Sequence, residues 1–286
     1  MPELPEVECI RRELSRSLCG ATLRLLWLRR RDIVVGAATP RALLSNSRVH
    51  QINRHGKQLA VISDSGAVLV VRLGMTGQML LLRAGEKPPE HSHAAWSVSY
   101  ARRRDVLVFR DPRRFGRLET YASADAQNEA WNRLGPDALT ISAALLAEAL
   151  ASRRVPIKSA LLDQHLIAGV GNIYADEALF RARVHPCAPT NTLSKAMFAR
   201  LARAIRTVLK ESIACGGSTL RDYRTPSNER GQFVEHHRVY GRSGLLCLKC
   251  GTPIAALKVS GRTTCYCPSC QTREPTAPKR GGDARS

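Results

Sequence analysis

The first residues of the chain combine a proline with carboxylates in a way that could carry covalent chemistry. The sequence begins MPELPEVE. Removal of the initiator methionine would expose Pro2 as a secondary amine, which can attack an aldehyde-like carbon and give a cationic iminium. Glu3 or Glu6 could then act as a general acid beside this nucleophile. The same residues are also typical of a helix start, and taken alone they favour that structural interpretation.

Five of the nine cysteines lie close together near the C-terminus. Cys247-x-x-Cys250 and Cys267-x-x-Cys270 are separated by 16 residues, a spacing typical of a four-thiolate zinc site. A redox dithiol would not explain two such pairs. Cys265 precedes a ligand by two residues and is not expected to coordinate. Because four protein ligands leave no open position, we expect one structural Zn²⁺ that supplies the folding energy of a small unit.

The composition indicates a folded protein with a polyanionic partner. The 286 residues carry a formal net charge of +20 and a hydrophobic fraction of 44%. These values exclude a disordered or fibrous chain and leave room for about two domains. The charge is best explained by nucleic acid, whose phosphates bind basic proteins through counterion release. A basic surface that serves only solubility is the alternative.

Membrane insertion and secretion are both disfavoured. No apolar run approaches the ~20 residues of a membrane helix. Three glutamates occupy the first eight residues, where a secretory signal would carry basic residues followed by an apolar stretch. We therefore expect a cytoplasmic protein with no membrane partner. The lack of a coiled-coil pattern or a large apolar face predicts a monomer with no obligate protein partner.

These candidate groups need a scaffold, and the hydrophobic pattern predicts one in three parts. A helix over residues 3–18 is indicated by apolar residues at spacings of three and four. Short apolar runs with turns at 8–12 residue intervals then predict an antiparallel sandwich or barrel through about residue 122. Four helices follow, and a long loop over 218–232 separates them from the cysteine-rich unit. The predicted helices are 143–151, 157–167, 173–183 and 194–215.

Several sequence motifs, in this order and spacing, carry a family resemblance. They are PELPEVE at the start, RLGMTG at 72–77, DPRRFGRL at 111–118, LGPDAL at 134–139, GVGNIYADEALF at 169–180, GGSTLRD at 216–222, VYGR at 239–242 and the cysteine pairs. Over residues 2–271 the chain resembles the formamidopyrimidine-DNA glycosylases, bacterial repair enzymes for oxidised purines. The sister family, endonuclease VIII, shares the architecture but removes oxidised pyrimidines, and it is the alternative. The PELPEVE start resembles the purine branch.

The resemblance implies an α+β multidomain fold with DNA in a central cleft. An N-terminal antiparallel β-sandwich with a leading helix would span 2–122. A helix–two-turn–helix domain would span 134–232 and carry a lesion loop at 216–233. A zinc-finger β-hairpin would span 238–271, and a disordered basic tail 272–286. The partner would be damaged double-stranded DNA, which associates the enzyme with the bacterial nucleoid.

The resemblance also implies roles for five residues in catalysis. Pro2 would attack C1′ of the damaged nucleotide and expel the base, and the Schiff base would undergo β- and δ-elimination. Glu3 would protonate the sugar ring oxygen with Glu6 as its supporting carboxylate. Lys57 would assist at the sugar and in β-elimination, and Arg262 in δ-elimination and phosphate binding.

A second group of residues would contact DNA by the same resemblance. Flipping a nucleotide out of the duplex costs a few kcal/mol, which side chains that fill the vacated stack offset. The void-filling residues would be Met75, Arg113 and Phe115, in turn-like, solvent-exposed settings. The backbone contacts would be His91, Arg153, Lys158, Asn172 and Tyr240. The loop at 227–233 departs from the family pattern, so lesion preference rests on the remaining motifs.

Two further interpretations belong to other functional classes. A non-catalytic DNA-binding protein could keep the fold and the zinc finger, but it would be expected to lose Pro2, Glu3 or Lys57, and all three are present. An RNA-binding zinc-ribbon protein would leave the N-terminus unexplained. No carboxylate cluster resembles a catalytic metal site, so we expect no requirement for Mg²⁺.

Overall fold

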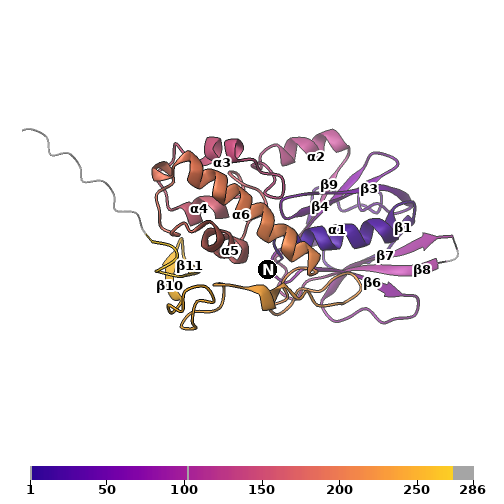
Figure 1. Cartoon of the computed structure of the whole chain (residues 1–286). Coiled ribbons are helices and arrows are strands. Elements are labelled where there is room, and N and C mark those ends of the chain that lie inside the picture. Colours follow the sequence, from indigo (N-terminus) through magenta and orange to yellow (C-terminus); the bar gives the residue numbers. More distant parts are fainter. Residues whose placement is uncertain (1, 102, 273–286) are drawn as a thin grey trace, which may run out of the picture.

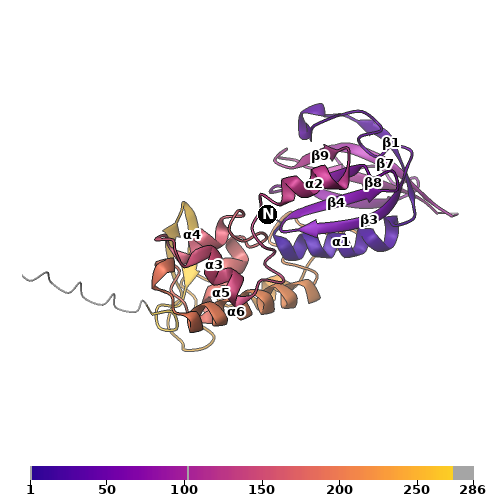
Figure 2. The same ribbon diagram turned by 90° about the horizontal axis from the view of Figure 1, so that it is seen from above.

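The computed structural model describes residues 2–101 and 103–272. A β-rich part and a helical part lie side by side, and the N-terminus lies between them in both views (Figures 1 and 2). Among the described residues, no helix is long and apolar enough to cross a membrane. The disordered tail predicted over 272–286 lies outside the described residues except for residue 272.

Helix α1 (Leu4–Leu18) confirms the predicted N-terminal helix. Its apolar face, including Val7, Ile10 and Leu14, is fully buried. The helix packs on strand β3 (Ser47–His55) and on helix α6 (Lys195–Ala214), so it joins the two parts of the molecule. This placement brings the first residues of the chain to the junction of the β-rich and helical parts.

The β-rich part is a nine-stranded sheet folded into two layers. The strand order is β2-β9-β5-β4-β3-β1-β7-β8-β6, with every pair antiparallel except β2 and β9. Only two residue pairs join β1 to β3, where the layers meet. One core takes side chains from both layers, as in the predicted sandwich. The other strands are β1 (Thr22–Leu28), β2 (Val34–Val35), β4 (Gln58–Ser63), β5 (Val68–Arg72), β6 (Gln78–Arg83), β7 (Ser92–Tyr100), β8 (Arg103–Arg110) and β9 (Arg117–Tyr121).

The helical part contains α3 (Ala143–Leu150), α4 (Ile157–Leu162), α5 (Asn172–Ala182) and α6. The prediction of one helix over 157–167 is wrong beyond Leu162, because the chain turns extended at Asp163. The Gln164 side chain then holds a double turn: it donates to the Leu162 and Val170 carbonyls and accepts from the Gly169 amide. Helix α2 (Ala124–Trp131), which was not predicted, lies between the two parts of the chain.

The cysteine-rich unit is a two-stranded hairpin, β10 (Ala255–Val259) and β11 (Arg262–Tyr266). Two buried carboxylates of α5 fix it to the helical part. Asp176 accepts a hydrogen bond from the Cys265 amide at 2.9 Å. Glu177 accepts from the amides of Arg238, Val239 and Tyr240 at 2.8–3.0 Å. The unit has its own small core of buried residues around the cysteines.

Candidate active site

Pro2 and Lys57 line the same cavity, of about 140 Å³, at the junction between the two parts of the molecule. Its walls come from the β-rich part at Leu73 and Gly74 and from the helical part at Gln164 and Ala168. Sequence positions 2, 57, 74 and 164 therefore meet only because the fold brings them together. The arrangement puts Pro2 and Lys57 on the walls of one partly enclosed space.

Glu3 is buried at the N-terminus of α5. Its two carboxylate oxygens accept hydrogen bonds from the amides of Ile173 at 3.0 Å and Tyr174 at 3.4 Å. These amides have no partner within the helix, and the helix dipole favours a negative charge at this end. The side chain is only 1% exposed. Glu3 is thus fixed next to Pro2 by the first turn of α5 in addition to the capping box that it forms with Glu6 at the start of α1.

Glu6 accepts three hydrogen bonds in the interior. They come from the Glu3 amide at 2.7 Å, the Tyr174 hydroxyl at 2.5 Å and the Ser218 amide at 2.8 Å. Tyr174 also shares a 2.6 Å hydrogen bond with the Ser212 hydroxyl. Burial raises the pKa of Glu6, and the neighbouring Glu3 charge raises it further. Glu6 therefore ties α1 to α5 and to the start of the long loop.

Lys57 lies in the tight turn between β3 and β4. Burial lowers the pKa of its amine, the Glu3 charge partly offsets this, and the nearby Arg262 lowers the pKa again. A lowered pKa increases the fraction of neutral amine, which is the form that can accept a proton. Gly56 precedes Lys57 with φ +54°, and a Cβ there would lie 2.8 Å from the Ala168 side chain. The turn is therefore pressed against the helical part.

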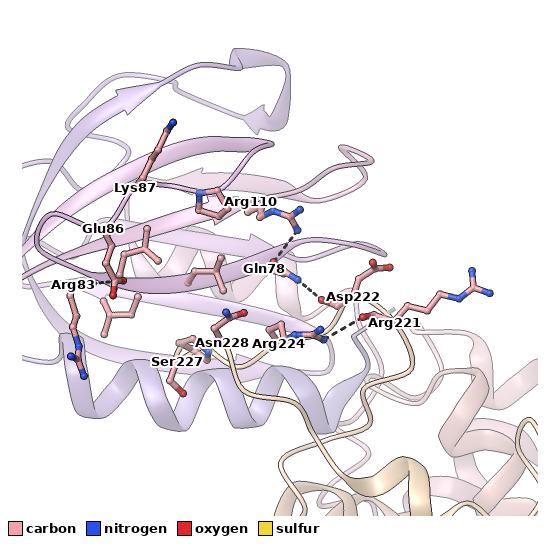
Figure 3. Close-up of a pocket in the computed structure, with 15 residues that line it drawn as sticks. Gln78, Arg83, Glu86, Lys87, Arg110, Arg221, Asp222, Arg224, Ser227 and Asn228 are labelled. Atoms are coloured by element: carbon pink, nitrogen blue, oxygen red, sulfur yellow. Dashed lines mark hydrogen bonds between the residues drawn. The ribbon is translucent and has the colours of Figure 1, made fainter.

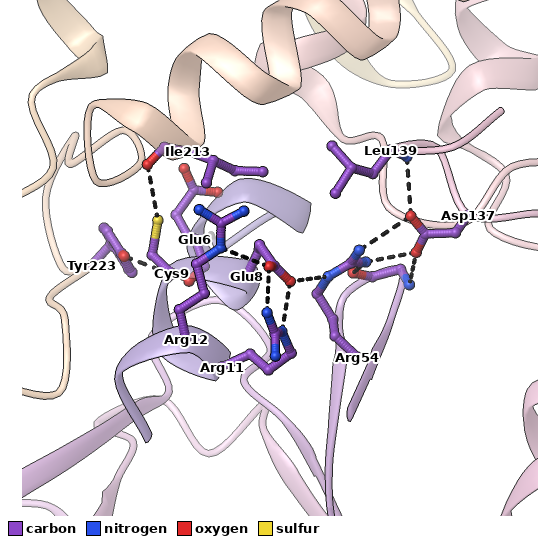
Figure 4. A network of polar contacts seen from close by, with 11 residues as sticks. Glu6, Glu8, Cys9, Arg11, Arg12, Arg54, Asp137, Leu139, Ile213 and Tyr223 are labelled. Carbon is purple, nitrogen blue, oxygen red and sulfur yellow. Dashed lines mark hydrogen bonds and ion pairs between the residues drawn. The ribbon is translucent and has the colours of Figure 1, made fainter. Parts of the chain in front are cut away.

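A buried charge network holds this turn in place (Figure 4). The Arg54 guanidinium donates to Asp137 at 2.6 and 3.2 Å and to Glu8 of α1 at 3.0 Å. Asp137 also accepts from the Gly56 amide at 2.8 Å. Burial raises the pKa of Glu8, but hydrogen bonds from Arg11, Arg12 and Arg54 outweigh it and hold the pKa at about 2. The pairing of Arg54 with Asp137 could not be predicted from local sequence patterns, because the contact spans 83 positions of the chain.

The proposed void-filling residues share one edge of the sandwich. Met75 and Phe115 are 40% and 52% exposed, as predicted, and the Arg113 guanidinium lies 4.6 Å from the centre of the Phe115 ring. Buried Asp111 joins their two loops, because it accepts from the Thr76 hydroxyl and from the Gly116 amide. His91 is exposed beside them, and its carbonyl accepts from the Asp111 amide.

The four predicted zinc ligands are brought together. The Sγ atoms of Cys247, Cys250, Cys267 and Cys270 lie within 4.8 Å of one another. The amides of Lys249 and Cys270 donate to Cys247 Sγ at 3.5 Å and to Cys267 Sγ at 3.4 Å. Four converging thiolates with such amide contacts fit one structural zinc ion and leave no position for water.

Arg262 begins strand β11 at the tip of the hairpin and is exposed. Its guanidinium makes no hydrogen bond or ion pair to another described residue. Its positive charge lowers the pKa of Lys57, so the hairpin acts electrostatically on a residue that lines the Pro2 cavity. Asn172, at the first position of α5, donates to the Thr263 carbonyl at 3.1 Å and so links α5 to this hairpin.

Lys158 was expected to contact the DNA backbone, but the structure places its side chain in the interior. Its side chain is 0% exposed and donates to Asp176 at 2.6 Å and to the Thr263 carbonyl at 3.3 Å. A lysine enclosed in this way holds the hairpin on α4 and α5 instead of facing solvent. Burial raises the pKa of Asp176 to about 6 despite this partner. Arg153 is exposed, as expected, and Tyr240 is half-buried against the ring of His237.

The long loop covers a second, larger pocket beside β6 (Figure 3). This pocket has a volume of about 710 Å³. The Leu81 amide donates to the Pro226 carbonyl, and the Gln78 side chain donates to the Asp222 carbonyl, so the loop lies against the strand. At its base the Gly231 amide donates to the Thr219 hydroxyl at 2.8 Å. The loop is closed on itself and on the sandwich.

Comparison with known proteins agrees with this arrangement. The model of the formamidopyrimidine-DNA glycosylase N-terminal domain matches residues 1–118. That of the formamidopyrimidine-DNA glycosylase H2TH domain matches 134–224, and that of a zinc finger found in FPG and IleRS matches 244–273. These matches fall on the sandwich, the helical part and the hairpin.

Relatives are similar over their whole length. A formamidopyrimidine-DNA glycosylase of Thermus thermophilus is 43% identical over 96% of this chain and 100% of its own, and one of Desulfitobacterium hafniense is 39% identical over 95% and 100%. The crystal structure of the MutM (Fpg) protein from Thermus thermophilus has a TM-score of 0.83 at 41% identity, covering 96% of this chain and 100% of that one. A complex of Lactococcus lactis Fpg with abasic-site DNA has a TM-score of 0.85 at 31% identity, covering 95% and 100%. The chain therefore belongs to the formamidopyrimidine-DNA glycosylase family of DNA glycosylases.

Proposed function

We propose that this glycosylase excises oxidised purines, 8-oxoguanine and formamidopyrimidines, from duplex DNA and then cleaves the strand as an AP lyase. The observation that carries the proposal is the shared cavity of Pro2 and Lys57, with Glu3 fixed beside it. Support for the substrate comes from solved relatives, one bound to DNA containing carbocyclic 8-oxo-G and another to DNA containing Fapy-dG.

In the proposed mechanism, Pro2 nitrogen forms a bond to C1′ while the bond from C1′ to the base breaks. The N–H proton of Pro2 passes to the Glu3 carboxylate, which gives it to the ring oxygen as the C1′–O4′ bond breaks and the sugar opens. The base leaves with the electron pair of the broken glycosidic bond. The resulting iminium withdraws electrons from C2′, where loss of a proton expels the 3′ phosphate. Loss of a second proton, from C4′, expels the 5′ phosphate. Water then hydrolyses the iminium and frees Pro2.

The supporting residues follow from their positions. The neutral fraction of Lys57 would take part in proton transfer at the sugar, with Arg262 on the departing phosphate. Met75, Arg113 and Phe115 would fill the space left by the flipped nucleotide. Arg153, Asn172, His91 and Tyr240 would contact the DNA backbone, whereas Lys158 would act through the hairpin. We propose that the enzyme works as a monomer, with the sandwich over 2–122, the helical domain over 134–232 and the finger over 238–271.

Excision from matched duplexes tests the substrate. We expect release of 8-oxoguanine opposite cytosine to be much faster than release of thymine glycol opposite adenine, with strand products that carry phosphates at both ends. Faster release of thymine glycol would move the enzyme to the pyrimidine-directed alternative and would leave the mechanism intact.

A further inference from the structure

Three leucines of the zinc finger are unusually exposed. Leu245, Leu246 and Leu248 are 54%, 62% and 61% exposed, and we call them the leucine surface. The finger core is formed instead by residues such as Val239 and Ile254. These leucines therefore contribute little to folding, and clustered exposed apolar side chains are typical of interaction sites.

A cavity of about 280 Å³ lies next to the leucine surface. It is lined by Glu177, Phe180, Arg181, Arg238, Leu248 and Lys249. Its walls are rigid: Phe180 packs against the finger core, and the Glu177 carboxylate is held by three consecutive backbone amides. A preformed cavity with an aromatic and an aliphatic wall suits one large apolar side chain.

The rim of the cavity is positively charged. The side chains of Arg238 and Lys249 are exposed and make no hydrogen bond or ion pair within the described ranges. Arg181 is already paired with Glu211 at 2.7 and 2.8 Å. The Glu177 carboxylate accepts hydrogen bonds from three backbone amides, and its charge also interacts with Arg238. Arg238 and Lys249 together still outweigh this single negative charge, so the rim stays positive. This charge distribution complements carboxylates on either side of an inserted apolar group.

The cavity lies at the end of α5 that is remote from Glu3. Glu3 contacts the first turn of α5, whereas Phe180 follows Asn172 by eight residues, about 12 Å along the helix axis. A ligand at this cavity would leave the Pro2 cavity open. A second copy of this chain is a poor occupant because two chains with a net charge of +20 repel each other.

We propose that the leucine surface and this cavity bind a short acidic segment of a partner protein, which inserts one large apolar side chain between Phe180 and Leu248. The apolar walls distinguish the site from a phosphate site, and the cationic rim selects acidic over basic segments. Such a contact would let the enzyme be recruited while its cleft holds DNA.

A peptide series tests the proposal with the full-length, zinc-loaded protein. The probes are fluorescein-labelled heptapeptides with three Asp residues on each side of a central residue that is varied over all types. We expect Phe, Trp, Leu and Met at the centre to bind at least tenfold more tightly than Ala or Ser. Saturating abasic-site DNA should leave this binding unchanged.

Substitutions locate the binding site. Leu248→Asp and Lys249→Glu should each weaken binding at least fivefold, while Leu145→Asp, at a comparably exposed leucine of α3, should have no effect. Leu248 lies between two zinc ligands in the sequence, so the zinc content of each variant is measured. Leu246→Asp provides a second test of whether the exposed leucines take part in binding. Peptide binding that does not depend on the central residue overturns the proposal, as does binding that DNA displaces. Binding that survives in Leu248→Asp, Leu246→Asp and Lys249→Glu overturns it as well. Concentration-dependent dimers that Leu248→Asp abolishes would assign the surface to self-association and overturn it as well.

Discussion

The carboxyl carbon of Glu3 lies 2.2 Å from the position that a Cβ atom on Gly171 would occupy. Glycine at 171 is therefore what allows Glu3 to reach the amides at the start of α5. Leu4 is placed in the same way, because a Cβ on Gly169 would lie 2.4 Å from its side chain. The two glycines of the double turn thus fit the N-terminal segment that carries Pro2.

Gly171→Ala should displace Glu3 and lower excision by about 100-fold, because misplacement of a reacting group by about 1 Å can cost that much. Single-turnover excision of 8-oxoguanine measures the effect. Gly36→Ala is the control, since its Cβ would clash with Thr120 at the β2 edge of the sheet. The free energy of unfolding of Gly36→Ala should be lower than that of the wild type. The molecules that remain folded should excise 8-oxoguanine at the wild-type rate. Equal rates in Gly171→Ala and wild type would contradict the placement of Glu3.

The ionisation of Glu8 should make the free energy of unfolding depend on pH in the acid range. Its pKa is about 2 in the folded state against 4.5 in the reference state, so its stabilising effect is complete above pH ~5 and is lost as pH falls toward 2. The shift corresponds to about 3 kcal/mol. The stability gap between wild type and Glu8→Gln, from urea unfolding, should therefore shrink between pH 5 and pH 3. A constant gap for Glu8→Gln would refute the network.

Phe115→Ala should lower binding to an abasic-site duplex by about tenfold, in line with ~1–3 kcal/mol for stacking of a base on an aromatic ring. The ring is half exposed, so the melting temperature should not change. Leu26→Ala removes a similarly exposed side chain from β1 and should leave DNA affinity unaltered. A large loss of thermal stability in Phe115→Ala would mean that the ring is structural.

Cys250→Ser should release zinc and weaken DNA binding while the sandwich stays folded. The metal supplies the folding energy of the hairpin, whose core is separate from that of the sandwich. Metal content by mass spectrometry and affinity for an abasic-site duplex are the two readouts. Cys19→Ser, at an exposed cysteine outside the finger, should keep both. Full DNA affinity without zinc would exclude the finger as a DNA clamp.

The sequence predicted best what depends on short spacings. Helix α1 follows from a regular apolar period, and the zinc site from two closely spaced CxxC pairs. Strand β3 lacks a regular alternation of buried side chains, because a bulge between Val49 and Gln51 shifts its register against β4. Helix α2 was missed because it is polar, with only one fully buried side chain.

The hydrogen bonds and ion pairs that hold the site residues in place could not be predicted from local sequence patterns. Tyr174 contacts Glu6 across 168 positions, and nothing around either residue indicates that they meet. Lys158 was expected at the surface because lysines are seldom buried without a partner, and its partner Asp176 lies on another helix. The family motifs identified the residues of the site, whereas the hydrogen bonds that fix them depend on tertiary contacts.

The central claim is that Pro2 is the nucleophile, and borohydride trapping tests it most directly. The enzyme is mixed with an 8-oxoguanine:cytosine duplex, reduced, and the covalent adduct is mapped by peptide mass spectrometry. We predict an adduct on the N-terminal peptide at Pro2, which Pro2→Gly reduces strongly while binding to abasic-site DNA persists. An adduct on Lys57 or another lysine of the wild-type enzyme, with none at Pro2, would contradict the account.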